Sequence, residues 1–386
     1  MQGLLVKYGE IALKGRNRHI FENKLIESIS SNISKEYKVK KEQGRILIHK
    51  DGKIDYDKLI PIVKNTIGVT YVCPCDIIQD QKIDNLKQAV ENFLINNYKN
   101  NFIFKIETKR SNKSYPLNSL EISTIIGEHI LNKIKGTAVN VVNPEITVNV
   151  ELRNNAYVFS KIIKGIGGLP TVSGKVLCLL SGGIDSPVAT FLTARRGVEV
   201  SAVYFHSSPY TTEHARQKVI DLCKRIKTFT GDITLYIVNF TQLQLFLYNK
   251  LPQDKLTIFL KRTMVRISAK LAKNINAQAL VMGDSIGQVA SQTIHSIAAI
   301  DAVSNGMPII RPLATFDKQQ IIDIAQEIET YPISILPYED CCTIFVAKHP
   351  VTKPNIKVLE KMEEKIFNEL NSHIESTLND IEIISV

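Results

Sequence analysis

Apolar residues recur along this chain with two different spacings. From residue 175 onward, short continuous apolar runs, typical of buried strands, alternate with segments whose apolar residues recur every three or four positions, as in helices. The runs are KVLCLL, VEVSAVYF, ITLYIVNF, ALVMGD and PIIRPL, and the helical segments lie near 186–196, 213–229, 256–275, 290–301 and 317–329. This alternation with short links predicts a doubly wound parallel α/β sheet, whose ligands bind beyond the carboxyl ends of the strands.

Two smaller α+β patterns precede this unit. Residues 1–57 predict one domain, with a strand in GLLVKYGEIAL, a helix through FENKLIESISSNISKEY and an edge strand in GRILIHKDG. Residues 58–165 predict a second domain, in which the turn Asn154-Asn155 indicates a β-hairpin. Its expected helices lie near 57–66, 82–98 and 119–135, and its expected strands at 102–108, 145–151 and 155–163. The Gly-rich stretch 165–174 is the predicted linker to the third domain, residues 175–386.

The charge pattern favours a polyanionic partner. The formal net charge is +10, and the excess of Lys and Arg lies before residue 300, whereas the remainder is acidic. In KIETKRSNKSYPLNSLE the basic side chains crowd among polar residues, which makes them candidate contacts for nucleic-acid phosphates: Lys105, Lys109, Arg110 and Lys113. A solvated loop is the alternative, because charge alone does not distinguish the two.

Features of the whole chain predict a cytoplasmic protein. It has six cysteines among 386 residues, no leader that is first charged and then apolar, and no apolar stretch long enough to cross a bilayer. We therefore expect a protein of the reducing cytosol with no membrane association.

A Gly-rich loop follows the first strand of the third domain. In LCLLSGGIDSP, the glycines after Ser181 let the backbone turn tightly, so that several N–H groups and the positive end of the next helix face an anion. Phosphate is the expected ligand, although a Gly-Gly pair by itself is also common in ordinary turns. The other Gly-rich stretch is not a Walker loop, because the spacing from Gly168 to Gly174-Lys175 is one residue too long and Val176 replaces the required hydroxyl.

SGGIDSP resembles the PP-loop of enzymes that cleave ATP between its α- and β-phosphates. The order of a small α+β domain, a basic α+β domain with KRSNKSYPLNSLEI, and then SGGIDSPVA, YFHSSPYT, GDSIGQVASQT and EDCCTIFVAKHPVTKP resembles the tRNA 4-thiouridine synthetases, or tRNA sulfurtransferases, over essentially the whole chain. The resemblance implies a ferredoxin-like domain, a THUMP RNA-binding domain and a Rossmann-like PP-loop domain.

The activity implied by this resemblance is sulfur transfer to tRNA. Uridine 8 is adenylated by ATP, with release of pyrophosphate, and a cysteine persulfide then delivers sulfur to give 4-thiouridine. Some members also supply sulfur for the thiazole of thiamine, which would add a thiamine sulfur-carrier protein to the expected partners. The other expected partners are tRNA, a cysteine desulfurase and a second copy of the chain in a homodimer. ATP and Mg²⁺ are the expected cofactors.

The resemblance also assigns residues to the nucleotide site. Asp185 would position Mg²⁺ or the phosphates, because a carboxylate beside phosphates needs a cation. Loop contacts are expected from Ser181, Gly182, Gly183, Asp185 and Ser186, and the adenine and ribose pocket from Leu179, Leu180, Tyr204 and Phe205. For the two aromatic residues, an ordinary strand core is the alternative. Gly283 and Gln292 would contact the nucleotide. Lys261-Arg262 stands where the family tends to have paired arginines, and either residue could meet phosphate.

The adjacent cysteines Cys341-Cys342 are the expected sulfur carriers. A zinc site is not expected, because the chain has no pair of C-x₂-C motifs, and two incidental buried thiols are the alternative. Cys73-Pro-Cys75 is expected to be structural, and Cys178 and Cys223 receive no role. The chain ends at Val386 after an acidic helical stretch, without the rhodanese domain of many relatives. We therefore expect the desulfurase to load Cys341 or Cys342 directly, and a partner cysteine or small reductant to regenerate the thiol.

Two other functions fit parts of the pattern. An ATP-dependent amidating synthetase with a PP-loop would need an ammonia source, and no glutaminase-like segment is present. A non-catalytic RNA-binding protein would not need Asp185 or the paired cysteines. An ATP–pyrophosphate exchange that depends on tRNA distinguishes all three.

Overall fold

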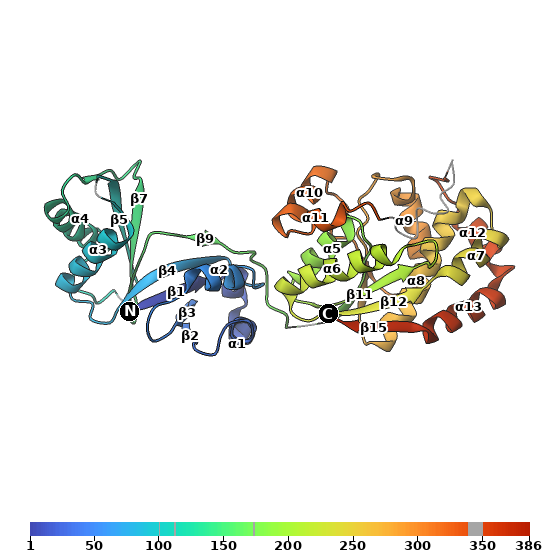
Figure 1. The fold of residues 1–386 in the computed structure, drawn as a ribbon, viewed down its shortest axis with the longest axis horizontal. Coiled ribbons are helices and arrows are strands. Elements are labelled where there is room, and N and C mark those ends of the chain that lie inside the picture. Colours follow the sequence, from blue (N-terminus) through green and yellow to red (C-terminus); the bar gives the residue numbers. More distant parts are fainter. Residues whose placement is uncertain (100, 112, 173, 339–349) are drawn as a thin grey trace. The chain divides into compact units, whose positions relative to one another are not determined.

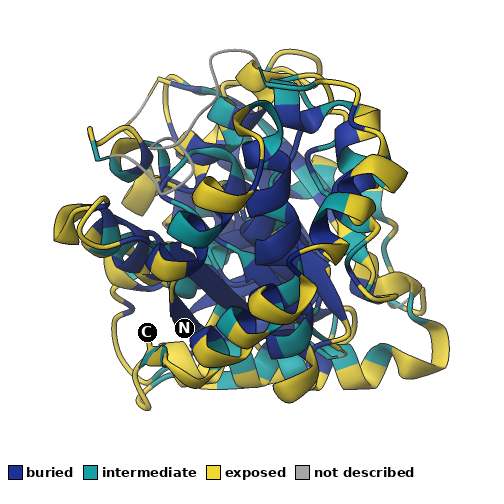
Figure 2. Ribbon diagram, turned by 90° about the vertical axis from the view of Figure 1, so that its right-hand side faces the viewer, coloured by how far each residue is buried: buried dark blue, intermediate teal, exposed yellow. Residues whose placement is uncertain are grey.

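The computed structural model describes residues 1–386 except 100, 112, 173 and 339–349. The chain divides into two compact units, Met1–Gly168 and Leu169–Val386 (Figure 1). Figure 2 shows the buried residues in the strands and in the central helices, with exposed residues on the outer faces of the surrounding helices and in the loops. Among the described helices, none combines the length and the apolar character that a membrane span requires.

The first unit is built on one mixed sheet. Its described strands form a nine-stranded sheet in the order β2-β3-β1-β4-β8-β7-β5-β6, with β9 also paired to β4. The strands are β1 (Gln2–Lys7), β2 (Lys38–Glu42), β3 (Arg45–His49), β4 (Tyr71–Ile78), β5 (Ile103–Arg110), β6 (Ala138–Val139), β7 (Ile146–Leu152), β8 (Ala156–Phe159) and β9 (Ile163–Lys164). The helices are α1 (Arg18–Asn32), α2 (Tyr56–Lys64), α3 (Ile83–Asn97) and α4 (Ser119–Lys133), with short 3₁₀ helices η1 (Glu10–Leu13) and η2 (Gly15–Asn17).

Local sequence patterns in this unit predict one hairpin correctly and one edge strand incorrectly. The predicted hairpin is confirmed, because β7 and β8 pair antiparallel with Leu152 opposite Ala156. The expectation of an edge strand in GRILIHKDG is wrong, because β3 is buried and lies between β1 and β2. The edge is β2, with the sequence KVKKE, whose charged side chains protect an unpaired strand edge but hide the strand from an apolar pattern.

The second unit contains the predicted doubly wound sheet. Its strand order is β14-β13-β10-β11-β12-β15, and the five strands before β15 are parallel. These strands are β10 (Lys175–Leu179), β11 (Glu199–His206), β12 (Thr234–Asn239), β13 (Ala279–Val281) and β14 (Ile309–Ile310). The antiparallel edge strand β15 (Ile381–Ser385) pairs with β12 and was not predicted, because the acidic C-terminal stretch has a helical pattern until just before it.

Helices cover both faces of this sheet. They are α5 (Asp185–Ala194), α6 (Glu213–Thr230), α7 (Thr241–Lys250), α8 (Leu256–Asn274), α9 (Ile294–Asp301), α10 (Lys318–Glu327), α11 (Tyr331–Ser334), α12 (Ile356–Glu364) and α13 (Phe367–Asn379). Two 3₁₀ helices, η3 (Gln253–Lys255) and η4 (Ala290–Gln292), precede α8 and α9. The chain runs from β10 through β11 to β12 on one side and then returns to β13 on the other side of β10. The carboxyl ends of β10 and β13 therefore form the switch point at which such folds bind ligands.

Candidate active site

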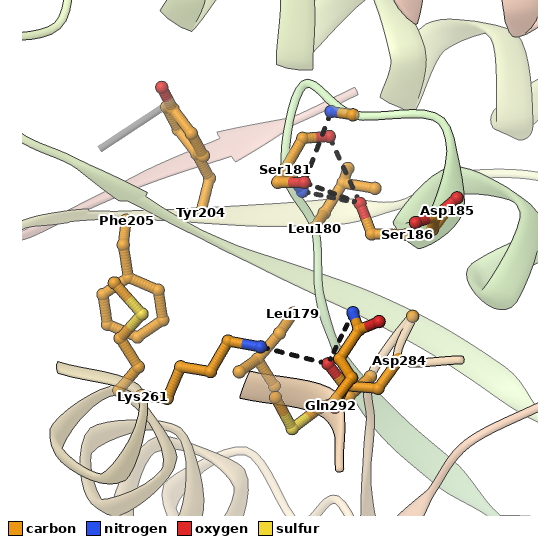
Figure 3. Close-up of a pocket in the computed structure, with 14 residues that line it drawn as sticks. Leu179, Leu180, Ser181, Asp185, Ser186, Tyr204, Phe205, Lys261, Asp284 and Gln292 are labelled. Carbon is orange, nitrogen blue, oxygen red and sulfur yellow. Dashed lines mark hydrogen bonds and ion pairs between the residues drawn. The ribbon is translucent and has the colours of Figure 1, made fainter. Parts of the chain in front are cut away.

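A cavity of about 230 Å³ opens at the carboxyl ends of β10, β11 and β13 (Figure 3). Of the predicted nucleotide-binding residues, all except Gly182 and Arg262 line it. These lining residues are Leu179, Leu180, Ser181, Gly183, Asp185, Ser186, Tyr204, Phe205, Lys261, Gly283 and Gln292, joined by Met264, Met282 and Asp284. Residues far apart in the sequence thus meet at the switch point of the sheet.

Two serine hydroxyls hold the glycine loop in shape. The Ser181 N–H donates to Ser186 Oγ at 2.8 Å, and the two hydroxyl oxygens lie 3.1 Å apart. The Gly183 N–H donates to Ser181 Oγ at 3.3 Å. Because Ser186 belongs to the first turn of α5, these bonds fasten the loop to the helix N-terminus, where backbone N–H groups attract anions.

Gly283 allows β13 to approach this helix turn. A Cβ atom at Gly283 would lie 2.8 Å from Ser186 N and 2.9 Å from Asp185 C, closer than real Cβ contacts. Any side chain there would push α5 away from the end of β13. Close backbone packing thus gives Gly283 a structural role at the cavity wall.

Two side chains that the sequence analysis missed hold Asp185. Lys318, the first residue of α10, forms an ion pair with Asp185 Oδ1, and Gln288 Nε2 donates to Asp185 Oδ2 at 2.8 Å. The Asp185 side chain is 19% exposed. Gln288 lies within the GDSIGQVASQT motif and could have been considered, whereas Lys318 begins an ordinary surface helix and carries no sequence signal.

Asp284 is a second missed carboxylate, buried at the cavity wall. It accepts hydrogen bonds from Lys261 Nζ at 3.2 Å, Arg311 Nε at 3.1 Å and Gln292 Nε2 at 3.3 Å. Burial alone would raise the pKa of Asp284, but the charges of Lys261 and then Arg311 outweigh it and hold this pKa below its ordinary value. Arg311 also pairs with Asp301 at 2.6 Å. The network fixes the Lys261 ammonium at the cavity.

The adjacent pair Lys261-Arg262 faces two different environments. Lys261 lines the cavity, whereas Arg262 is fully buried and donates to Glu363 at 2.9 and 2.6 Å and to the Ala299 carbonyl. The expectation that Arg262 contributes to the nucleotide site is therefore corrected. Consecutive helix residues point about 100° apart, so only one of the two reaches the cavity.

The remaining lining residues divide between contact and core. Tyr204 and Phe205 are 1% and 5% exposed, and Figure 3 shows their rings on opposite sides of β11. Phe205 packs against Phe240 with ring centroids 5.3 Å apart, so it belongs to the hydrophobic core although it also lines the cavity. Gln292 is 8% exposed, and its Oε1 accepts no hydrogen bond within the described part of the chain.

Metal binding at this site would depend on few protein ligands. Over the residues that the structure describes, no group of three or more His, Cys, Asp or Glu side chains is placed to hold a metal ion. Asp284 already pairs with two cations, Lys261 and Arg311. Asp185 is therefore the cavity carboxylate that remains for a metal ion, since its ion pair with Lys318 is partly exposed. A Mg²⁺ ion held there would take most of its oxygen ligands from phosphates and water, as Mg²⁺ commonly does.

The predicted RNA contacts lie in the first unit. Lys105, Lys109 and Arg110 belong to β5, and the Lys105 and Lys109 ammonium groups lie 4.0 and 3.0 Å from Glu107. Lys109 is 67% exposed, whereas Arg110 donates to the carbonyls of Lys113 at 3.3 Å and Tyr115 at 3.0 Å. Arg110 therefore shapes the loop, while the side chains of Lys109, which pairs with Glu107, and of Lys113 are exposed.

The predicted sulfur carriers, Cys341 and Cys342, lie outside the described residues. The four described cysteines are all buried, and burial raises the pKa of Cys73 to about 11 and that of Cys178 and Cys223 to about 12. Burial also raises the pKa of Cys75. These four thiols are protonated at neutral pH and poorly suited to nucleophilic chemistry.

Comparison with known proteins agrees with this layout. The model of the ThiI ferredoxin-like domain matches residues 3–73, that of the THUMP domain residues 80–161, and that of the thiamine biosynthesis protein (ThiI) residues 171–367. A probable tRNA sulfurtransferase of Agathobacter rectalis is 45% identical over 387 residues, covering 99% of this chain and 98% of the relative. That of Thermoanaerobacter pseudethanolicus is 49% identical over 367 residues, covering 94% and 95%.

Solved structures give the same result. A 4-thiouridine synthetase, crystallised as an RNA complex with bound ATP, matches with a TM-score of 0.90 and 35% identity over 100% of both chains. PH1313 from Pyrococcus horikoshii matches with a TM-score of 0.63 and 22% identity over 85% of this chain and 100% of its own, which shows a shared fold. The predicted order of ferredoxin-like, THUMP and PP-loop domains is confirmed. From the family models and the near full-length identity to curated relatives, it follows that this chain belongs to the tRNA sulfurtransferase (ThiI) family.

Proposed function

We propose that this tRNA sulfurtransferase uses ATP to adenylate uridine 8 of tRNA and then transfers persulfide sulfur to give 4-thiouridine. The observation that carries the proposal is the SGGIDSP loop, which hydrogen bonds preform at the switch point beside a cavity of about 230 Å³. The ATP and RNA bound to the solved 4-thiouridine synthetase, 35% identical to this chain, support it.

The two kinds of task fall to different parts of the chain. We assign tRNA binding to the ferredoxin-like domain, residues 1–57, and the THUMP domain, residues 58–165, with Lys105, Lys109 and Lys113 as phosphate contacts and Arg110 as the residue that shapes their loop. We assign ATP binding and chemistry to residues 175–386.

In the first step, uridine O4 attacks the α-phosphorus of ATP, and the bond to the β-phosphate oxygen breaks with release of pyrophosphate. The loop N–H groups and the N-terminus of α5 bind the departing phosphates, and Lys261 adds a positive charge. Leu179, Leu180, Tyr204, Phe205 and Gln292 enclose the nucleoside. Gln292 Oε1 offers a buried acceptor for an amino group.

Asp185 is the residue that would hold Mg²⁺ against the phosphates. When bound, the ion neutralises phosphate charge during the displacement. Lys318 and Gln288 keep the Asp185 carboxylate oriented. When no metal ion is bound, the Lys318 ammonium balances the charge of this carboxylate.

In the second step, a persulfide on Cys341 or Cys342 attacks C4 of the adenylated uridine, and AMP departs with the former O4. The product is a disulfide between the enzyme cysteine and the nucleotide sulfur. An external or partner thiol then attacks the cysteine sulfur, releases 4-thiouridine and leaves a disulfide, which a second thiol reduces. A cysteine desulfurase reloads the cysteine. The raised pKa values of the four described cysteines support the choice of Cys341 or Cys342 as the sulfur carrier.

The remaining partners follow from the family. We propose that the protein is a cytoplasmic homodimer. The description of its family model as a thiamine biosynthesis protein supports a further use of the same persulfide, in which a sulfur-carrier protein takes sulfur for thiamine.

The deciding experiment measures each step separately. ATP–pyrophosphate exchange should depend on tRNA, and mass spectrometry should find 4-thiouridine at position 8 only when desulfurase and cysteine are added. Replacing Cys341 or Cys342 by Ser should abolish thiolation in one variant while exchange continues. Exchange without tRNA, or wild-type thiolation by both single variants, would refute the proposal.

A further inference from the structure

A buried lysine on α6 holds the chain just before the paired cysteines. Lys218 is 5% exposed, and its ammonium donates to the Leu336 carbonyl at 2.8 Å and lies 3.5 Å from the Tyr338 carbonyl. Cys341 follows Tyr338 by three residues, and three residues of chain span at most about 11 Å. Lys218 thus fixes the backbone at Leu336 and Tyr338, shortly before the stretch that contains Cys341 and Cys342, called the cysteine segment below.

This stretch has little side-chain packing to hold it. Ile335 and Leu336 are 55% and 43% exposed, so their burial contributes little. The backbone leaves α11 and turns at once, with the Tyr338 N–H donating to the Leu336 carbonyl at 2.8 Å. Irregular backbone with exposed side chains depends on polar partners for its position, and the Lys218 ammonium supplies one.

Neighbouring contacts extend this anchor in both directions. The His214 ring, one turn before Lys218 on α6, stacks on Tyr338 with centroids 5.1 Å apart and planes 19° apart. On the other side, Ser334 Oγ donates to the Gly183 carbonyl at 3.2 Å, which ties α11 to the glycine loop. α11 itself lies against α6 (Figure 1). The residues before the cysteines are therefore tied both to α6 and to the loop.

Burying a lysine side chain has a high cost in free energy. Removing an ammonium group from water costs free energy that only good hydrogen bonds offset, and an apolar side chain of similar length would avoid the cost. A lysine at this place is better explained by the position that it imposes on the carbonyls it binds.

We propose that Lys218 is a positioning residue for the sulfur-transfer step. By holding the carbonyls of Leu336 and Tyr338, it sets where the chain enters the cysteine segment relative to the glycine loop. The proposal rests on the proposed function, because it assumes that Cys341 or Cys342 carries the persulfide. Lys218 does not line the cavity, so it is expected to leave adenylation unaffected.

The test compares Lys218→Met, Lys218→Arg and a matched control. Arg225→Met is the control, because Arg225 lies on the same helix and donates to the Ile328 carbonyl at 2.8 Å, ten residues before Tyr338. Each variant is assayed for tRNA-dependent ATP–pyrophosphate exchange, for persulfide loading by desulfurase and cysteine, and for single-turnover formation of 4-thiouridine. Hydrogen exchange of the peptide 331–338 reports the position of the segment without reference to activity.

We expect Lys218→Met to keep exchange and loading within about twofold of wild type and to slow 4-thiouridine formation at least about tenfold, because a misplacement of 1 Å can cost about 10²-fold. The peptide should exchange faster. Lys218→Arg should restore most of the rate, and Arg225→Met should change thiolation less than about twofold.

Several outcomes would overturn the proposal. Equal losses of pyrophosphate exchange and thiolation would make Lys218 a general support of the unit, and an unchanged thiolation rate would remove its role. A selective loss of the same size in Arg225→Met would show that any contact to this stretch has the same effect. Failure of the wild-type protein to adenylate or thiolate tRNA would instead refute the proposed function.

Discussion

Lys318 forms an ion pair with Asp185 although the two residues lie 133 positions apart in the chain. The pair joins the first turn of α10 to the first turn of α5, beside the glycine loop. The Asp185 carboxylate, which we propose meets the phosphates of ATP, is thus already held by a cation of the protein itself.

Asp185→Asn should abolish adenylation while leaving the fold intact. The amide keeps the shape of the side chain but loses the charge that the phosphates and their cation require. We expect a loss of at least about 10²-fold in tRNA-dependent ATP–pyrophosphate exchange, with tRNA affinity nearly unchanged. Asp323→Asn, on the exposed side of α10, is the control and should exchange normally. Near-normal exchange by Asp185→Asn would rule out its role.

Lys318→Met should lower the same activity, because Asp185 loses one of its two donors and the phosphate site loses a cation. We expect a decrease of roughly 10- to 100-fold in kcat/KM for exchange, with partial recovery in Lys318→Arg. The neighbouring variant Gln319→Ala should behave as wild type. If Lys318→Met and Gln319→Ala have equal rates, the ion pair has no part in the reaction.

Gly283→Ala and Gly127→Ala should change stability in opposite directions. A methyl group at Gly283 meets the backbone of Ser186 at 2.8 Å, so we expect a loss of about 1–3 kcal/mol in the free energy of unfolding. Gly127, within α4, has no atom within 4 Å of an added Cβ, and alanine should add about 0.5–1 kcal/mol there. Urea denaturation of each variant measures both values. The same sign for both would contradict the packing argument.

Glu363 should make stability depend on pH at the acidic end. Burial would raise its pKa, but Arg266 and Arg262 outweigh burial and hold the pKa below the ordinary value of 4.5. Its contribution is therefore complete above about pH 4.5 and is lost as the pH falls through the lowered pKa. Glu363→Gln leaves the buried Arg262 unpaired and should cost about 3–5 kcal/mol at pH 7.

The matched control for this variant is Glu360→Gln, on the exposed side of α12. The difference in unfolding free energy between wild type and Glu363→Gln should shrink below about pH 4, whereas Glu360→Gln should differ little from wild type at any pH. A difference that grows on acidification would have the wrong sign.

Lys109→Gln combined with Lys113→Gln should weaken tRNA binding by removing exposed charges. The slope of log affinity against log salt should become shallower by about 0.7–0.9 for each phosphate that the protein no longer neutralises. Lys133→Gln with Lys135→Gln, near the other end of α4, removes equal charge and is the control. Equal decreases in affinity for both pairs would indicate attraction by net charge alone. Fluorescence anisotropy at several salt concentrations measures these slopes.

Much of the fold was predictable because its signals are local. The parallel strands of the second unit are continuous apolar runs, and the glycine loop is a contiguous motif, so both could be recognised in the sequence. Strand β2 could not, because most of its residues are charged, and strand β15 could not, because its five residues directly follow a helical pattern. Their pairing depends on neighbours that fold from distant segments.

The candidate site follows the same division. Residues next to strand ends, such as Ser181 and Gly283, could be placed from the motif and the strand pattern. Lys318 could not, because its role comes from an ion pair that forms only after the chain folds. Asp284 also follows a strand closely, but its ion pairs with Lys261 and Arg311 are visible only in the folded chain. Which of Lys261 and Arg262 faces the cavity depends on the rotation of α8 about its axis, which a pair of basic residues does not reveal.

Strand β4 pairs with β1 on one side and with β8 on the other, so one strand completes the sheets of both small domains. A cut after residue 57 would strip β4 of β1 and expose its buried residues along a free edge, where other chains can add. The THUMP domain is therefore not separable from the ferredoxin-like domain. We expect that a soluble, independently folding fragment must begin at the first strand and extend through residue 168.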